Sequence, residues 1–173
     1  MGVEAAVQLI DLERGRALLR PVFGQVPRGR RPSHHWEVPG PEEPDRSAAP
    51  SLPEGAADQA YVWLTAVGRR SGLGRTVELW YGLRGSTLYF LAGAGPRASW
   101  VQNSLAAPSV SIRLAAGTYR GLARAVEPGT DEDQAARRLL AAKYQGWSEG
   151  RTLSGWARTS FCLAVELIEP VTT

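Results

Sequence analysis

The chain has 173 residues, of which 43% are hydrophobic, and a formal net charge of +3. That length and apolar content predict one domain with appendages and a real core. The small charge and the lack of helix–turn–helix, zinc-ligand or basic–aromatic patterns argue against a nucleic-acid-binding protein. A single cysteine, Cys162, excludes an internal disulfide and predicts a cytoplasmic location, with the thiol buried. No apolar run approaches the roughly 18 residues that a membrane span needs.

The first 58 residues divide by composition into two segments. Residues 1–20 have apolar positions at helical spacing among mixed charges, which predicts an amphipathic helix that docks on the domain or a partner chain. The alternative for this helix is weak association with a membrane surface. Residues 21–58 are rich in proline and poor in large apolar residues, so we expect a linker. Its adjacent His34 and His35 have no second ligand cluster, and no metal site is predicted.

Residues 59–173 are expected to form the compact domain, because short strand patterns alternate there with two helical ones. The predicted strands are Tyr61–Val67, Thr76–Leu83, Thr87–Ala92, Val110–Leu114, Thr118–Val126 and Leu163–Ile168. The predicted helices are Arg97–Ala107 and one that begins at the capping sequence after Thr130 and ends near Tyr144. This order predicts a mainly β fold, a barrel with flanking helices, and argues against a doubly wound sheet.

The loop between the first two predicted strands, Gly68 to Thr76, has the composition of an anion site. It holds three glycines, three arginines and two hydroxyl side chains in nine residues. Glycine permits sharp turns that aim backbone N–H groups at an anion, and arginine matches phosphate oxygens. The loop therefore predicts a grip on the phosphate of a nucleotide-like cofactor, with a solvated turn as the alternative.

Three groups of motifs, in order and spacing over Tyr61 to Glu169, resemble the deazaflavin (coenzyme F420)-dependent nitroreductases of the split β-barrel flavin and deazaflavin oxidoreductase superfamily. The first is Leu64 to Gly72 with Arg75 and Leu79-Trp80-Tyr81. The second is Leu88 to Ala92, then Trp100-Val101-Gln102-Asn103 and Ala107-Pro108. The third is Lys143-Tyr144 followed by Trp147.

This resemblance implies a six-stranded split β-barrel of the flavin mononucleotide-binding, pyridoxamine phosphate oxidase-like type, often a homodimer. It also implies an F420-dependent reductase that transfers hydride to a quinone, an activated enone or a nitroaromatic compound. The alternatives are a flavin mononucleotide oxidoreductase of the same fold, or a non-catalytic protein that binds the cofactor, a fatty ligand or a tetrapyrrole.

The resemblance also implies a set of site residues. The cofactor phosphate and acidic tail would contact the loop and its neighbours, the ring would lie along the second strand, and a helix face would complete the pocket. The implied cofactor-binding residues are Arg69, Arg70, Ser71, Gly72, Arg75, Thr76, Val77, Glu78, Leu79, Ala92, Gly93, Trp100 and Asn103. The implied catalytic residues are Tyr144 and Trp147, with packing as the alternative for Tyr144.

The sequence departs from the family pattern at three places. Glu78 stands where the family usually has proline, and the shortened loop after Ala92 lacks a lysine that is common there. Trp147 stands where nitro-reducing members often have tyrosine, and it has no phenol to donate a proton. The tryptophans Trp63, Trp80, Trp100, Trp147 and Trp156 are candidates for a stacking pocket around a planar acceptor.

Overall fold

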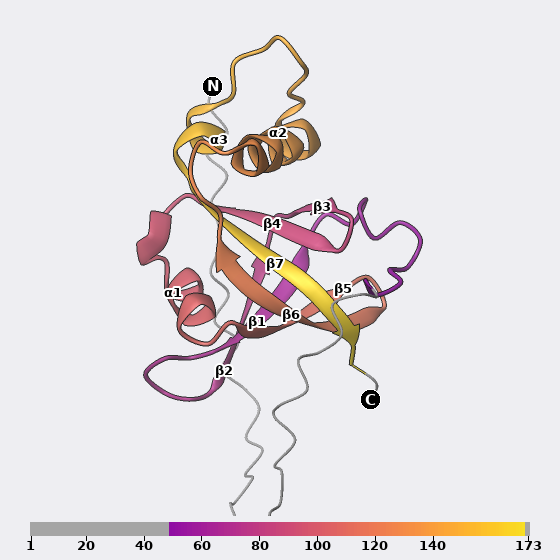
Figure 1. Ribbon diagram of the computed structural model, residues 1–173, viewed down its shortest axis with the longest axis vertical. Coiled ribbons are helices and arrows are strands. Elements are labelled where there is room, and N and C mark those ends of the chain that lie inside the picture. Colours follow the sequence, from indigo (N-terminus) through magenta and orange to yellow (C-terminus); the bar gives the residue numbers. More distant parts are fainter. Residues whose placement is uncertain (1–48, 172–173) are drawn as a thin grey trace, which may run out of the picture. The chain divides into compact units, whose positions relative to one another are not determined.

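The computed structural model describes residues 49–171 (Figure 1). The helix expected over residues 1–20 and most of the segment 21–58 lie outside the described residues. The described part is mainly β, as predicted. Its strands form one antiparallel sheet in the order β2-β1-β5-β6-β7-β4-β3. The strands are β1 (Val62–Val67), β2 (Gly74–Leu79), β3 (Gly82–Arg84), β4 (Thr87–Ala92), β5 (Ser109–Leu114), β6 (Gly117–Ala125) and β7 (Phe161–Pro170).

The count of seven strands corrects the prediction of six. The single strand expected over Thr76–Leu83 bends at Trp80 and Tyr81, so β2 pairs with β1 while β3 pairs with β4. The two edges of the sheet are thus consecutive pieces of one chain segment. The curled sheet returns on itself at this bend, which is consistent with a split barrel.

The barrel interior is filled by alternate residues of the strands, as the period-two pattern predicts. Leu64, Tyr81, Leu88 and Ile112 are among its fully buried members. Ahead of β1, Ala56 joins this core, and its carbonyl accepts a hydrogen bond from the Tyr81 hydroxyl. Burial raises the pKa of Tyr81 to about 12, so the phenol stays protonated and holds this contact at neutral pH.

A second core lies between the outer face of β4 and β7 and the helix α2 (Asp131–Gln145). Strand β4 is buried on both faces, which explains its nearly continuous apolar sequence. Thr130 caps α2 by accepting from the backbone N–H of Asp133, as the capping sequence predicts. The short helix α3 (Gly155–Thr159), which the sequence analysis missed, packs beside α2.

The remaining helical segment lies between β4 and β5. It consists of the 3₁₀ turn η1 (Gly95–Arg97) and helix α1 (Ser99–Ala106), where one helix was expected. Val101 is fully buried in the barrel core, and the Trp100 ring meets the Phe90 ring edge-on at 6.1 Å. These contacts fix α1 against the barrel, next to β1 and β6.

Cys162 should be chemically inert in the folded protein. It is buried in the second core, as predicted, and burial raises the pKa of its thiol to about 12. Because the thiolate is the reactive form, a disulfide reagent at pH near 8 should leave it unmodified until denaturant is added. Labelling rates measured across a denaturant series should follow global unfolding. Fast labelling in the absence of denaturant would contradict this burial.

No helix among residues 49–171 is both long enough and apolar enough to cross a lipid bilayer.

Candidate active site

The loop that joins β1 to β2 is closed by hydrogen bonds within itself. The Gly68 N–H donates to the Leu73 carbonyl at 2.8 Å, and the Gly72 N–H donates to the Gly68 carbonyl at 2.7 Å. Gly72 has φ of +67°, a conformation that favours glycine. A Cβ on Gly68 would lie 2.7 Å from Ser71 Oγ and 3.2 Å from the Leu73 carbonyl oxygen, so a larger residue there would force the loop to shift.

These internal bonds change the expectation for how the loop would hold an anion. The N–H groups of Gly68, Ser71 and Gly72 donate to loop carbonyls, and that of Leu73 donates to Ser71 Oγ. Within residues 68–73, the N–H of Arg70 alone has no acceptor among the residues that the structure describes. If the loop binds an anion as predicted, its arginine side chains would have to supply most of the donors.

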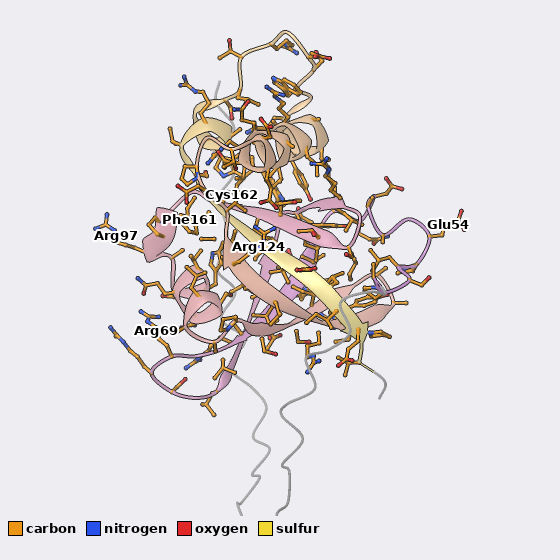
Figure 2. The ribbon with its side chains drawn as sticks, in the orientation of Figure 1. Glu54, Arg69, Arg97, Arg124, Phe161 and Cys162 are labelled. Atoms are coloured by element: carbon orange, nitrogen blue, oxygen red, sulfur yellow. The ribbon has the colours of Figure 1, made fainter. Side chains whose placement is uncertain are left out.

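The loop arginines are available to a ligand. Arg69, Arg70 and Arg75 are all exposed, and Figure 2 shows Arg69 extending outward on the side of the molecule where α1 and Arg97 lie. Across residues 49–171, the ion pairs involve other arginines, which are Arg120, Arg124 and Arg137. Three exposed cations in one loop, with no carboxylate in that part of the chain, have the charge that would suit a multiply charged anion.

Strand β2 has an edge that no described strand covers. β2 pairs with β1 along one side. After the bend, β3 pairs with β4, and that pairing begins at Gly82 opposite Tyr89. Continuing that register would place Leu79 opposite Ala92 and Glu78 opposite Gly93, but the strands separate there. The predicted site residues of β2 and β4 therefore flank the split in the barrel.

The side chains of β2 point to two different faces. Val77 and Leu79 pack against the barrel core, whereas Thr76 and Glu78 lie on the outer face, opposite Thr65 and Trp63 of β1. The Thr76 and Thr65 hydroxyls are 2.7 Å apart and hydrogen-bonded. Glu78 is exposed on this outer face, so its carboxylate points away from the barrel interior.

Helix α1 contacts the loop directly. Asn103 Oδ1 accepts hydrogen bonds from the backbone N–H of Arg69 at 3.2 Å and from Arg69 Nη1 at 3.0 Å. Asn103 is 6% exposed, and Trp100 lies one turn earlier on the same helix. The structure thus brings Asn103 and the arginine loop together, although 34 residues separate them in the sequence.

The sequence model of the F420H(2)-dependent quinone reductases matches residues 52–154, which are more than half of the chain. The chain belongs to the F420H(2)-dependent quinone reductase family. It is therefore an F420-dependent reductase, and its cofactor is coenzyme F420.

Solved structures agree with this family assignment. An F420-H2 dependent reductase, FDR-A, is 26% identical to this chain. The superposed region covers 62% of this chain and 95% of FDR-A, with a TM-score of 0.50. An F420 reductase, 20% identical, shares the fold with a TM-score of 0.50. The superposed region covers 70% of this chain and 97% of that reductase. The heme storage protein HutZ of Vibrio cholerae, 16% identical, shares the fold with a TM-score of 0.52. The superposed region covers 69% of this chain and 87% of HutZ. No curated protein matches the chain.

Tyr144 of this reductase lies at the opposite end of the β1–β2 hairpin from the arginine loop. Its hydroxyl accepts from the Tyr81 N–H at 3.1 Å and lies 2.9 Å from the Ala60 carbonyl, to which it can donate. Six residues of β1 separate this position from the loop, a length of about 20 Å. Burial raises the pKa of Tyr144. Its ring stacks on Trp80 with centroids 4.6 Å apart.

Trp147 belongs to a different part of the molecule. Its indole N–H donates to the Arg151 carbonyl at 2.6 Å, and its side chain lines an open hollow in the segment that follows α2, with Arg138 and Leu153. Within the described part of the chain, this hydrogen bond and hollow do not involve the β1–β2 loop. The catalytic roles predicted for Tyr144 and Trp147 remain predictions.

Trp156, one of the tryptophans that the sequence analysis proposed for a stacking pocket, lies next to the end of β4, a contact that its sequence position did not reveal. The indole of Trp156 meets Trp80 edge-on with centroids 5.7 Å apart. A Cβ on Gly93 would lie 3.5 Å from Trp156 Cδ1, so Trp156 adjoins the end of β4 at the split. Its position in the five-residue helix α3, too short to have an apolar period, hid this contact.

Proposed function

We propose that this F420-dependent reductase transfers hydride from reduced F420 to a planar acceptor such as a quinone, an activated enone or a nitroaromatic compound. The observation that carries the proposal is the position of the loop arginines, which stand exposed at one end of the open β2 edge. A phosphate-bearing cofactor held at that end can extend along the strand toward the split.

The residues present fit such a cofactor. Arg69, Arg70 and Arg75 would hold its phosphate and acidic tail, with Ser71 and Gly72 shaping the loop. A charge pair at about 4 Å contributes about 1 to 4 kcal/mol, depending on the local dielectric, so three arginines can dominate the affinity. Arginine also offers paired donors that match phosphate oxygens.

The ring of the cofactor would lie in the split of the barrel. Thr76 to Leu79 present an unpaired strand edge there, whose backbone groups can donate to and accept from a polar ring. Ala92 and Gly93 form the opposite side, and Gly93 has no side chain to obstruct a close approach. Trp100 of α1 completes the set of residues that we assign to cofactor contact, and Asn103 of the same helix adjoins the loop through Arg69.

When bound, reduced F420 supplies the hydride; the protein positions the acceptor and excludes water. The Trp156 ring beside Gly93, with the Trp80 ring edge-on to it, provides an apolar, aromatic wall suited to a planar acceptor. We propose that the proton which completes the reduction comes from water, because the Tyr144 hydroxyl is already hydrogen-bonded to backbone groups at the Trp80–Tyr81 bend.

The Tyr144→Phe variant tests whether the Tyr144 hydroxyl has a structural role or a catalytic one. The variant keeps the ring that stacks on Trp80 but loses the backbone contacts, so we expect it to be less stable by about 1 to 2 kcal/mol. We expect kcat to stay within about threefold of the wild type, since a lost general acid would lower it by about a hundredfold or more. Thermal unfolding and steady-state kinetics check the two quantities. A large fall in kcat without loss of stability would assign proton donation to Tyr144.

We further propose a homodimer and a cytoplasmic location. Within the described part of the chain, no helix covers the outer face of β2, β1 and β5, where Arg113 stacks on the Trp63 ring at 4.2 Å. Such an amphipathic sheet face suits contact with a second copy. Light scattering of the purified protein tests the oligomeric state.

The deciding experiment is a fluorescence titration of the full chain with F420 and, separately, with flavin mononucleotide. It is followed by turnover of reduced F420, measured as the absorbance of the oxidised form, with menadione, cyclohexenone and a nitroimidazole. Salt-sensitive F420 binding and turnover with at least one acceptor are expected. Preference for flavin mononucleotide, or F420 binding without turnover of any acceptor, would overturn the proposal.

A further inference from the structure

One buried side chain holds the arginine loop from outside. Among residues 49–171, the hydrogen bonds that join residues 68–73 to the rest of the molecule are the two from Arg69 to Asn103 Oδ1. The other loop bonds are internal. Without Asn103, the loop would be attached only through the two strands that flank it.

The contact determines the orientation of both side chains. The Arg69 backbone N–H and guanidinium are both donors, so the Asn103 amide must present its oxygen to them and its nitrogen elsewhere. One oxygen therefore fixes the main chain at Arg69 and the direction of its guanidinium together.

Asn103 is itself held on a rigid support. The neighbouring Val101 is fully buried in the barrel core, and Trp100 packs against Phe90. The position of the Asn103 oxygen is therefore set by the barrel core, whereas the exposed Arg70 and Ser71 have no comparable anchor among the described residues.

We propose that Asn103 is a positioning residue that acts through Arg69, aiming its guanidinium at the cofactor phosphate, and not a residue whose main effect comes from touching the cofactor. This inference rests on the proposed role of Arg69 in holding that phosphate. It differs from the role implied for Asn103 by family resemblance, which is direct cofactor contact.

A double-mutant cycle on F420 affinity distinguishes the two roles. Asn103→Ala should raise the Kd for F420 about tenfold in the wild-type background, because a hydrogen bond to a charged group is lost. In the Arg69→Ala background the same change should alter the Kd less than about twofold, since residues that act through one another are not additive. Gln102→Ala, at the neighbouring half-buried position of α1, is the matched control and should leave the Kd unchanged. Equal effects in both backgrounds would overturn the proposal.

A second measurement does not require the cofactor. Limited trypsin digestion of the free protein should cut after Arg69 and Arg70 about tenfold faster in Asn103→Ala than in wild type or Gln102→Ala, because the loop has lost its anchor. Asn103→Asp keeps an acceptor oxygen and should retain protection, yet bind F420 more weakly, because its charge opposes the phosphate. If wild type does not bind F420, the proposed function fails, and the digestion alone decides whether Asn103 holds the loop. Unchanged cleavage in Asn103→Ala would then refute that part too.

Discussion

Replacing Arg69 and Arg70 together with alanine is expected to weaken F420 binding by about a hundredfold or more, because each charge-assisted hydrogen bond contributes about 1.5 to 3 kcal/mol. Both side chains are exposed and form no ion pair within residues 49–171. Their removal should therefore leave the fold intact and lower the thermal unfolding midpoint only slightly, through loss of the Arg69 Nη1–Asn103 Oδ1 hydrogen bond. Fluorescence titration measures the affinity, and circular dichroism verifies the fold.

The control for this experiment is a double variant of equal charge change, Arg138→Ala with Arg158→Ala, at exposed positions of α2 and α3. It should bind F420 like wild type. The wild-type affinity should also fall with rising salt, and this dependence should be weaker in the loop variant, because fewer charges meet the phosphate. An unchanged affinity in a folded Arg69/Arg70 variant would remove the loop from the cofactor site.

Leu140→Ala should have the largest effect on stability among simple truncations of α2. Leu140 is fully buried between α2 and the outer face of β4 and β7. Its truncation should lower the free energy of unfolding by about 2 to 5 kcal/mol, since the lost apolar contact and the remaining cavity both contribute. Urea denaturation followed by tryptophan fluorescence measures the change, because Trp80 stacks on Tyr144 of α2 and Trp156 is part of α3.

Leu139→Ala is the matched comparison, since Leu139 is the adjacent leucine of the same helix but only partly buried. Its effect should be the smaller of the two. Leu139 packs over Gly82, where an added Cβ would lie 2.6 Å from Leu139 Cδ2, so this variant also reports how tightly α2 rests on β3. Similar losses in both variants would mean that burial in the second core does not govern the stability of α2.

The sequence predicted the strands well because their local signal is strong. The run Thr87–Ala92 is apolar at almost every position and forms a strand buried on both faces, as expected. The bend at Trp80 and Tyr81 could not be predicted, because the alternation of inward residues continues through Leu79, Tyr81 and Leu83 without interruption. At the bend the chain exchanges one partner strand, β1, for another, β4. A local sequence pattern does not indicate which strand will be the partner.

The candidate site was predictable in composition but not in detail. The glycines and arginines of the loop indicated an anion site, yet the internal use of most loop N–H groups depends on the folded loop. The Arg69–Asn103 contact joins distant segments, and nothing in the spacing of either residue reveals it. The aromatic rings of Trp80, Tyr144 and Trp156 likewise come from three separate places in the chain, which are the β2–β3 bend, α2 and α3.

The uncovered edge of β2 has a consequence for solubility. An exposed strand edge is a template on which another chain can add a strand, and proteins commonly protect such edges with charged side chains. Arg75 and Glu78 place opposite charges on this strand. The glycine-rich loop precedes the strand, and the aromatic pair Trp80-Tyr81 follows it. Glu78 is thus a charged residue of the kind that protects strand edges, at the position where the family usually has proline, which protects an edge by having no N–H to donate.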